Sequence, residues 1–221
     1  RLQLRGDATY QTASVPANSV DPTYPDKVES ARGLLTWAPA FWFNAQLSAG
    51  TVHEERSNLG SPFTGERKTD RNRVLASMVF LPGKKTAVTP SYAFYQNNQT
   101  GPIAYQDLTG AITAEGGVPY ADTAHLASLT VSHAVTDVLL LSADVAKSWS
   151  RGNWQNSGVV PGSSGIESYS ALKLVETVLG ADVQLRYTKN FGTDFRYQFR
   201  KIDDILDNTQ DGTNQVVIAT L

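Results

Sequence analysis

The sequence predicts an all-β fold: an antiparallel up-and-down transmembrane β-barrel of about ten strands, formed as a single domain by residues 1–221. Three observations predict it. Apolar and polar residues alternate over long stretches, which is the period of a strand whose two faces differ. Short connections between these stretches alternate with long polar ones. Aromatic residues gather near both kinds of connection, as they do at the two borders of a membrane barrel.

The connections come in two lengths. The short ones centre on Pro39 and on residues 82–85, 135–137 and 190–193, whereas the long polar ones lie around residues 12–29, 55–71, 97–121, 150–167 and 203–213. Strict alternation brings every short connection to the same end of the strands. Bacterial outer-membrane barrels are built in this way, with tight periplasmic turns and long external loops.

Ten strands are expected, in order near residues 1–11, 31–38, 41–54, 72–81, 86–97, 125–134, 138–149, 168–188, 194–202 and 214–221. In the first segment, Leu2, Leu4, Ala8 and Tyr10 fall on one face and charged or polar residues on the other. The four segments that follow are expected to pair as hairpins around the short turns at Pro39 and at residues 82–85.

The second half of the chain alternates in the same way. Leu129 and Val131 are separated by polar residues, the stretch 139–146 places leucine, alanine and valine at every second position, and the stretch 195–200 alternates aromatic residues with arginine and glutamine. A helix would instead space its apolar residues three and four apart. The segment 168–188 is too long for one strand and changes phase near residues 173–177, which predicts a β-bulge or two shorter strands there.

Aromatic residues form two groups. One group lies close to the short turns and comprises Trp37, Phe41, Phe43, Phe80, Tyr187 and Phe195. The other lies close to the long loops and comprises Tyr10, Tyr92, Phe94, Trp149 and Tyr169. Amphipathic aromatic rings favour the headgroup level of a bilayer, so these groups are expected to form two interfacial girdles.

Charged residues occupy the strand positions opposite the apolar face. The candidate lumen-lining residues are Arg5, Asp7, Arg73, Asp144, Asp182, Arg186, Arg196 and Arg200. In a narrow barrel they would form a salt-bridge network that fills the interior. In a wider barrel they would line water and select ions or substrates. Both alternatives stay open, because the sequence does not determine how many strands the complete assembly has.

Composition narrows the class of protein. No apolar run reaches the roughly 18 residues of a membrane-spanning helix. The net charge is −2 and the charges are scattered, so no nucleic-acid partner is expected, and the absence of cysteine rules out disulfides and thiol catalysis in this chain. A soluble barrel or sandwich is the alternative, in which a second sheet rather than lipid would cover the apolar face. Residues 1–4 and 217–221 read as strands in progress, so we expect a trimmed chain or part of a larger one.

The hairpin that runs from Phe80 through the 82–85 turn to Tyr95, and the pair formed by residues 184–187 and 195–199, resemble bacterial outer-membrane β-barrel proteins of the porin-like type. The resemblance implies an outer-membrane location, with the bilayer around the apolar face. It implies a channel or scaffold that passes solutes, or holds a lumenal or periplasmic protein partner, in a polar lumen. It implies no enzymatic activity, no catalytic residue, no metal and no cofactor.

Two other functions are open. Outer-membrane proteases of the omptin type use Asp and His residues at the external rim of a ten-stranded barrel, and His53, His125, Asp122, Asp203 and Asp204 are expected near such a rim. No local motif matches, so solvated loop ends are the preferred interpretation. An adhesive or structural barrel would act through the loops at 97–121 and 150–167, whose glycine, asparagine, serine and tyrosine suit adaptable contacts.

Overall fold

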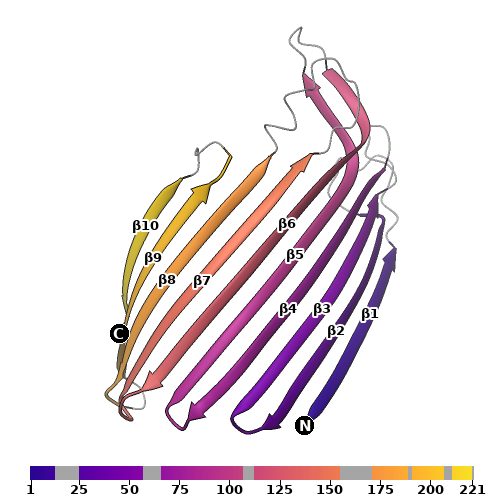
Figure 1. The fold of residues 1–221 in the computed structure, drawn as a ribbon. Coiled ribbons are helices and arrows are strands. Elements are labelled where there is room, and N and C mark those ends of the chain that lie inside the picture. Colours follow the sequence, from indigo (N-terminus) through magenta and orange to yellow (C-terminus); the bar gives the residue numbers. More distant parts are fainter. Residues whose placement is uncertain are drawn as a thin grey trace.

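The computed structural model describes residues 1–12, 25–56, 66–106, 112–154, 171–188, 191–206 and 211–220. These residues form one antiparallel sheet of ten strands, in which each strand pairs with its neighbours in sequence (Figure 1). The strands are β1 Leu2–Thr12, β2 Lys27–Ala40, β3 Phe43–Arg56, β4 Arg67–Gly83, β5 Thr86–Gln106, β6 Ile112–Ala134, β7 Leu139–Trp154, β8 Leu172–Arg186, β9 Gly192–Asp204 and β10 Gly212–Thr220. The predicted antiparallel up-and-down arrangement of ten strands is therefore confirmed.

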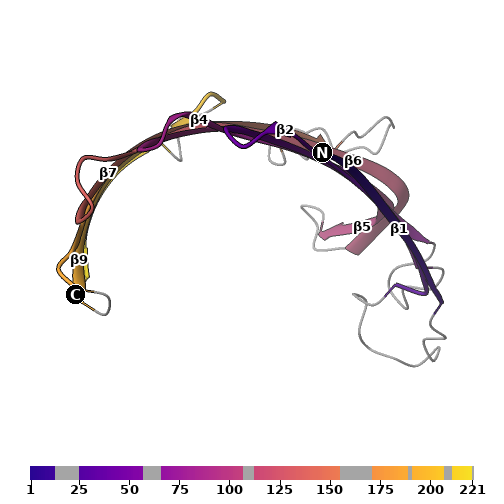
Figure 2. The same ribbon diagram turned by 90° about the horizontal axis from the view of Figure 1, so that it is seen from below.

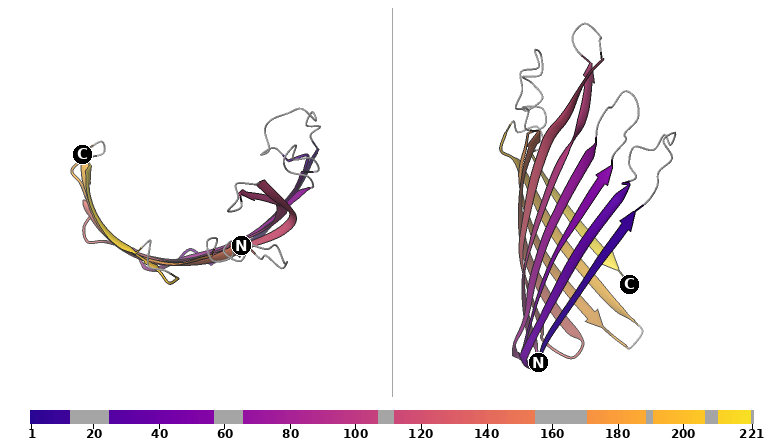
Figure 3. Two further views of the ribbon diagram at one scale, coloured as in Figure 1. Left: turned by 90° about the horizontal axis from the view of Figure 1, so that it is seen from above. Right: turned by 90° about the vertical axis from the view of Figure 1, so that its right-hand side faces the viewer.

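The sheet is curved like the wall of a barrel. Seen along the strands it forms an arc, with β1 towards one end and β10 at the other (Figures 2 and 3). Among the described residues β1 pairs only with β2, and β10 only with β9, so the arc is open. No helix in the described part of the chain is long and apolar enough to cross a membrane.

The four predicted short turns lie together at one end of the sheet, the lower end in Figure 1. Phe41 and Trp42 join β2 to β3, Lys84 and Lys85 join β4 to β5, and residues 135–138 join β6 to β7. In the last of these turns the hydroxyl of Thr136 accepts a hydrogen bond from the Leu139 amide at 3.1 Å. Five residues, 187–191, join β8 to β9, of which residues 189–190 lie outside the described part. The predicted short turns at one end of the sheet are confirmed, except that Pro39 lies within β2 and the turn itself is formed by Phe41 and Trp42.

The predicted loop at residues 97–121 is wrong over most of its length. β5 continues to Gln106 and β6 begins at Ile112, so the two strands form a hairpin that extends beyond the rest of the sheet (Figure 1). A register shift lies between Gly101 and Ile103, and the hairpin curls towards the inside of the arc (Figure 3). Glycine, proline and asparagine are frequent in this segment and are typical of turns and loops, so it was mistaken for a loop.

The predicted break near residues 173–177 is also wrong. β8 is one strand, and its register with both β7 and β9 is continuous. The apparent change of phase has a simple cause, because Leu172 and Leu174 lie on the otherwise polar face of the sheet. The predicted starts of β2 and β4 were likewise several residues late, since these strands begin in polar segments at Lys27 and Arg67.

Candidate functional site

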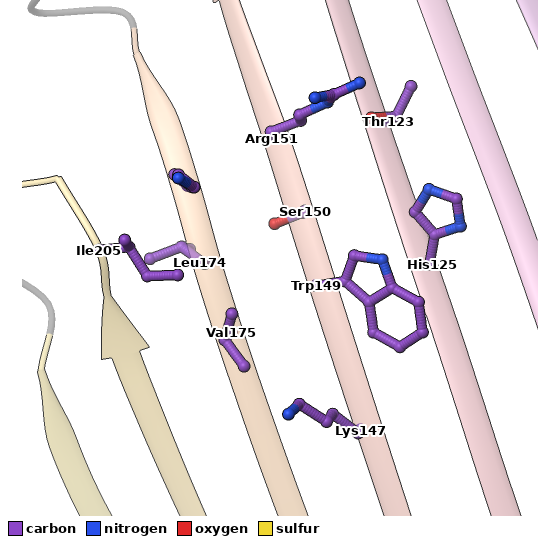
Figure 4. A pocket seen from close by; sticks show the side chains of 10 residues that line it. Thr123, His125, Lys147, Trp149, Ser150, Arg151, Leu174, Val175 and Ile205 are labelled. Atoms are coloured by element: carbon purple, nitrogen blue, oxygen red, sulfur yellow. The ribbon is translucent and has the colours of Figure 1, made fainter.

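The register divides the side chains between two faces. Directly paired residues of an antiparallel sheet point to the same side, and successive residues alternate. Although β10 carries apolar residues on both faces, the apolar residues of β1 to β9 thereby gather on one face. This face includes His125, Lys147 and Trp149. Figure 4 shows these side chains on the outer side of the curved sheet whose arc is seen in Figure 2. The apolar face is therefore convex, and the opposite, polar face is concave.

The convex face has no cover within the described residues. Eight apolar side chains of interior strands on this face are each 37% to 46% exposed: Leu47, Met78, Leu129, Val131, Leu141, Val145, Leu179 and Val183. The buried apolar residues of the described part are only Ala93 and Val118. A soluble sandwich needs a second layer over this face, and the described residues supply none.

The predicted aromatic groups lie at two levels of the sheet, one at the short turns and the other nearer the loops but partway along the strands, since β5 continues for twelve residues beyond Phe94. At the turn end, the ring centroids of Trp37 and Phe43 are 5.5 Å apart and those of Trp42 and Phe80 are 5.7 Å apart. At the level nearer the loops, His125 stacks on Trp149 at 5.2 Å, with an interplanar angle of 8°. Tyr169 lies outside the described residues. Sequence reasoning treated the histidine as a rim residue and missed that it belongs to this aromatic cluster.

The eight predicted lumen-lining residues all lie on the concave face. They belong to β1, β4, β7, β8 and β9. The register places them on the face opposite the apolar residues of these strands. Contact with a lumen stays a prediction. The concave face is not uniformly polar, because Leu34, Leu75 and Leu126 share one row of it with Ser48 and Ala93.

A charged cluster crosses β7, β8 and β9 on the concave face. The guanidinium of Arg196 donates a hydrogen bond from Nη2 to Oδ1 of Asp144 at 3.4 Å. These residues belong to strands that do not pair with each other, and Gly180 of β8 lies between them. A Cβ at Gly180 would overlap the carboxylate of Asp144. The glycine therefore leaves the space through which the aspartate reaches across a whole strand.

Substitution of Gly180 by alanine should displace the Asp144 carboxylate and lower the free energy of unfolding by about 1 kcal/mol, within the range for losing an exposed ion pair. Gly33→Ala is the matched control, because a Cβ at Gly33 meets nothing within 4 Å. That variant should be neutral or slightly more stable, since alanine loses less backbone entropy on folding. Urea unfolding of both variants tests the expectation, and equal effects would contradict it.

Other predicted charges on this part of the wall are also paired. Arg200 Nε contacts Glu176 Oε1 at 2.5 Å. Asp182 is the register partner of Arg196, and its Oδ2 accepts a hydrogen bond from Gln184 at 3.3 Å. The wall formed by β7 to β9 therefore carries two ion pairs, Arg196–Asp144 and Arg200–Glu176, with the carboxylate of Asp182 beside them.

The wall formed by β1 to β4 differs, because arginines dominate it. Besides the predicted Arg5 and Arg73 it carries Arg32 and Arg71, which sequence reasoning did not single out. Arg71 pairs with Glu54 at 3.1 Å. A cavity of about 560 Å³ opens over these strands. The arginines are visible in the sequence, but their proximity depends on a register that the sequence does not reveal.

The five rim residues considered for a hydrolase are not brought together. His53 and His125 lie on the convex face, about 14 Å apart across β4 and β5 and a further four residues, about 13 Å, apart along the strands. Asp122 and Asp204 lie on the concave face. His53 instead contacts Asp70 at 2.6 Å and Glu55 at 3.2 Å within a surface charge cluster. No group of three or more His, Asp and Glu that could hold a metal ion exists among the described residues.

Comparison with known proteins shows a likeness of fold. No protein-family model and no curated protein sequence matches the chain. Among solved structures, the siderophore receptor PiuA from Acinetobacter baumannii is similar, with a TM-score of 0.52 and 12% sequence identity. The likeness covers 98% of this chain but 37% of the receptor. The chain thus spans just over a third of the receptor's length, and the shared feature is the antiparallel sheet itself.

Proposed function

We propose that the chain is part of the wall of a bacterial outer-membrane β-barrel, with its convex face in lipid and its concave face lining a wet lumen. The lumen acts as a porin-like channel or as a scaffold that holds a protein partner. The observation that carries the proposal is the segregation of most apolar and polar side chains onto opposite faces of nine consecutive curved strands, β1 to β9. The proposal includes no catalytic role, because the candidate rim residues lie on different faces.

Lipid is the best-supported cover for the convex face. The apolar side chains between the two aromatic groups form a band that a bilayer would match. Arg151 and Lys173 lie on the loop side of Trp149, whereas Lys147 lies two residues nearer the turns, and the three line a cavity of about 740 Å³ together with His125 and Trp149 (Figure 4). Cations at this level suit anionic headgroups, while their aliphatic stems lie against the apolar band.

A wet lumen is better supported than a filled interior. Ten strands that closed on themselves would leave room for little more than their own side chains. The described strands form an open arc, and the similar receptor is more than twice as long as this chain. Further strands that completed the wall would enclose a wider space, in which the charged concave face would meet water.

Cysteine labelling tests the orientation of the wall, because the chain has no native cysteine. Ser77 lies on the concave face and Ala76, its neighbour in β4, on the convex face. In intact outer membranes, Ser77→Cys should react with a membrane-impermeant maleimide, whereas Ala76→Cys should react only after detergent is added. Equal labelling of the two positions in membranes would contradict the proposal.

A further inference from the structure

We propose that the concave face carries a binding site for a small organic or inorganic anion with carboxylate or phosphate groups, held between Arg32 of β2 and Arg73 of β4 above Gly50 of β3. The inference rests on the proposed function and deepens it by naming the class of solute. It assigns a role to Arg32, to Gly50 and to the cavity over β1 to β5.

The strand register places the residues of the site next to one another. Arg32 pairs with Gly50, and Gly50 pairs with Arg73, so the three residues form one row on the concave face. Neighbouring strands lie about 4.8 Å apart, which places the two arginine backbones about 10 Å from each other. A Cβ on Gly50 would lie 3.8 Å from Cβ and Cγ of Arg32. Because Gly50 has no side chain, the space between the side chains of Arg32 and Arg73 is open.

The row continues on both sides of the arginines. Asp7 is the partner of Arg32 in β1, and Tyr95 is the partner of Arg73 in β5. Both line the same cavity of about 560 Å³, as does Asn97. Tyrosine and asparagine supply neutral hydrogen-bond donors beside the cations. The single carboxylate, that of Asp7, lies on the far side of Arg32 from Gly50, so it flanks the gap rather than fills it.

The two guanidinium groups have unused donors. Arg32 donates one hydrogen bond, from Nε to the hydroxyl of Ser48 at 3.4 Å. Arg73 makes no hydrogen bond or ion pair with the described residues. Arg196 and Arg200, on the opposite part of the wall, are each paired with a carboxylate. The charge of the Arg32–Arg73 pair is therefore available to a ligand, whereas the charge of the other two is already neutralised.

The chemistry of arginine selects the ligand. A guanidinium presents five donors in a planar fork, which matches the two oxygens of a carboxylate or the oxygens of a phosphate. Two forks that face a common gap would bind one anion from both sides. A cation has no favourable position there, because two of the three charged groups of the row repel it.

Calorimetric titration of the purified protein in detergent tests the site, with citrate and inorganic phosphate as separate probes. Arg32→Ala and Arg73→Ala should each weaken binding of the better probe about tenfold or more, as expected for a lost charge-assisted hydrogen bond. Lys147→Ala, which removes one positive charge from the convex face, should change it less than about twofold. If neither probe binds, or if the arginine variants bind as Lys147→Ala does, the inference is overturned.

Three further variants separate a site from general electrostatics. Arg73→Lys keeps the charge but loses the fork, so it should still weaken binding several-fold. Gly50→Ala should do the same by placing a methyl group in the gap. The double variant of Arg32 and Arg73 should lose less than the product of the single effects, because both contact one ligand. Retained β-sheet circular dichroism shows that each variant folds.

The outcome is distinguishable from that of the proposed function. Loss of binding with normal labelling at Ser77→Cys would remove the anion site and leave the membrane wall intact. Anion binding with labelling that does not alternate would support the site and remove the membrane proposal.

Discussion

Replacement of Leu129 by arginine should lower the stability of the membrane-inserted protein by about 2–4 kcal/mol, the cost of a cationic side chain on the lipid face of a barrel near the bilayer midplane. Leu129 lies in β6 on the convex face, in a row with Pro90 and Val145, and it is 39% exposed. If lipid covers this face, arginine there must lose its hydration or distort the bilayer.

Thr130→Arg is the matched control, because Thr130 is the next residue of the same strand and lies on the concave face opposite Asp144. Arginine at this position meets a carboxylate, so we expect little change in stability. Urea unfolding in lipid vesicles, followed by the fluorescence of the four tryptophans, compares the two variants. Equal destabilisation, or a larger effect at Thr130, would show that the convex face is not the lipid face.

The strands could be predicted wherever one face is apolar. Alternation alone located the start of β7 to within one residue and both ends of β9 to within two, and the short turns followed from proline, glycine and the spacing of the strands. These features are local, so a single sequence contains them. The same reasoning failed for residues 97–121, because glycine, proline and asparagine interrupt the alternation in that hairpin although its two strands pair through their backbones.

The candidate site could be predicted only in part. The alternation of side chains between the two faces of a strand was enough to assign Arg5, Asp144 and Arg196 to the polar face. Which polar residues meet across strands depends on register, and register depends on the exact geometry of each turn. The approach of Arg32 to Arg73 over Gly50 and the reach of Asp144 over Gly180 were therefore hidden from the sequence. In both places the signal was a glycine in mid-strand, which is a recognised mark of close approach.

Reversal of the charge at Arg196 should change the ion selectivity of the proposed channel. Arg196→Glu would place a third carboxylate beside Asp144 and Asp182, both of which lie next to it on the concave face. The altered wall should favour cations over anions in planar bilayers relative to the unaltered protein. The lost ion pair should also lower the free energy of unfolding by about 1 kcal/mol, because both partners are partly exposed.

A charge swap separates a lumenal effect from general damage. Asp144→Arg combined with Arg196→Glu restores one ion pair across Gly180 with the charges exchanged, so it should recover most of the stability that Arg196→Glu alone loses. Its net charge equals that of the unaltered protein, and its selectivity should return most of the way. A double variant that stayed as unstable and as cation-selective as Arg196→Glu would mean that Asp144 and Arg196 do not act as a pair. A protein that conducted no current before or after substitution would instead favour the scaffold form of the proposal, in which a partner fills the lumen.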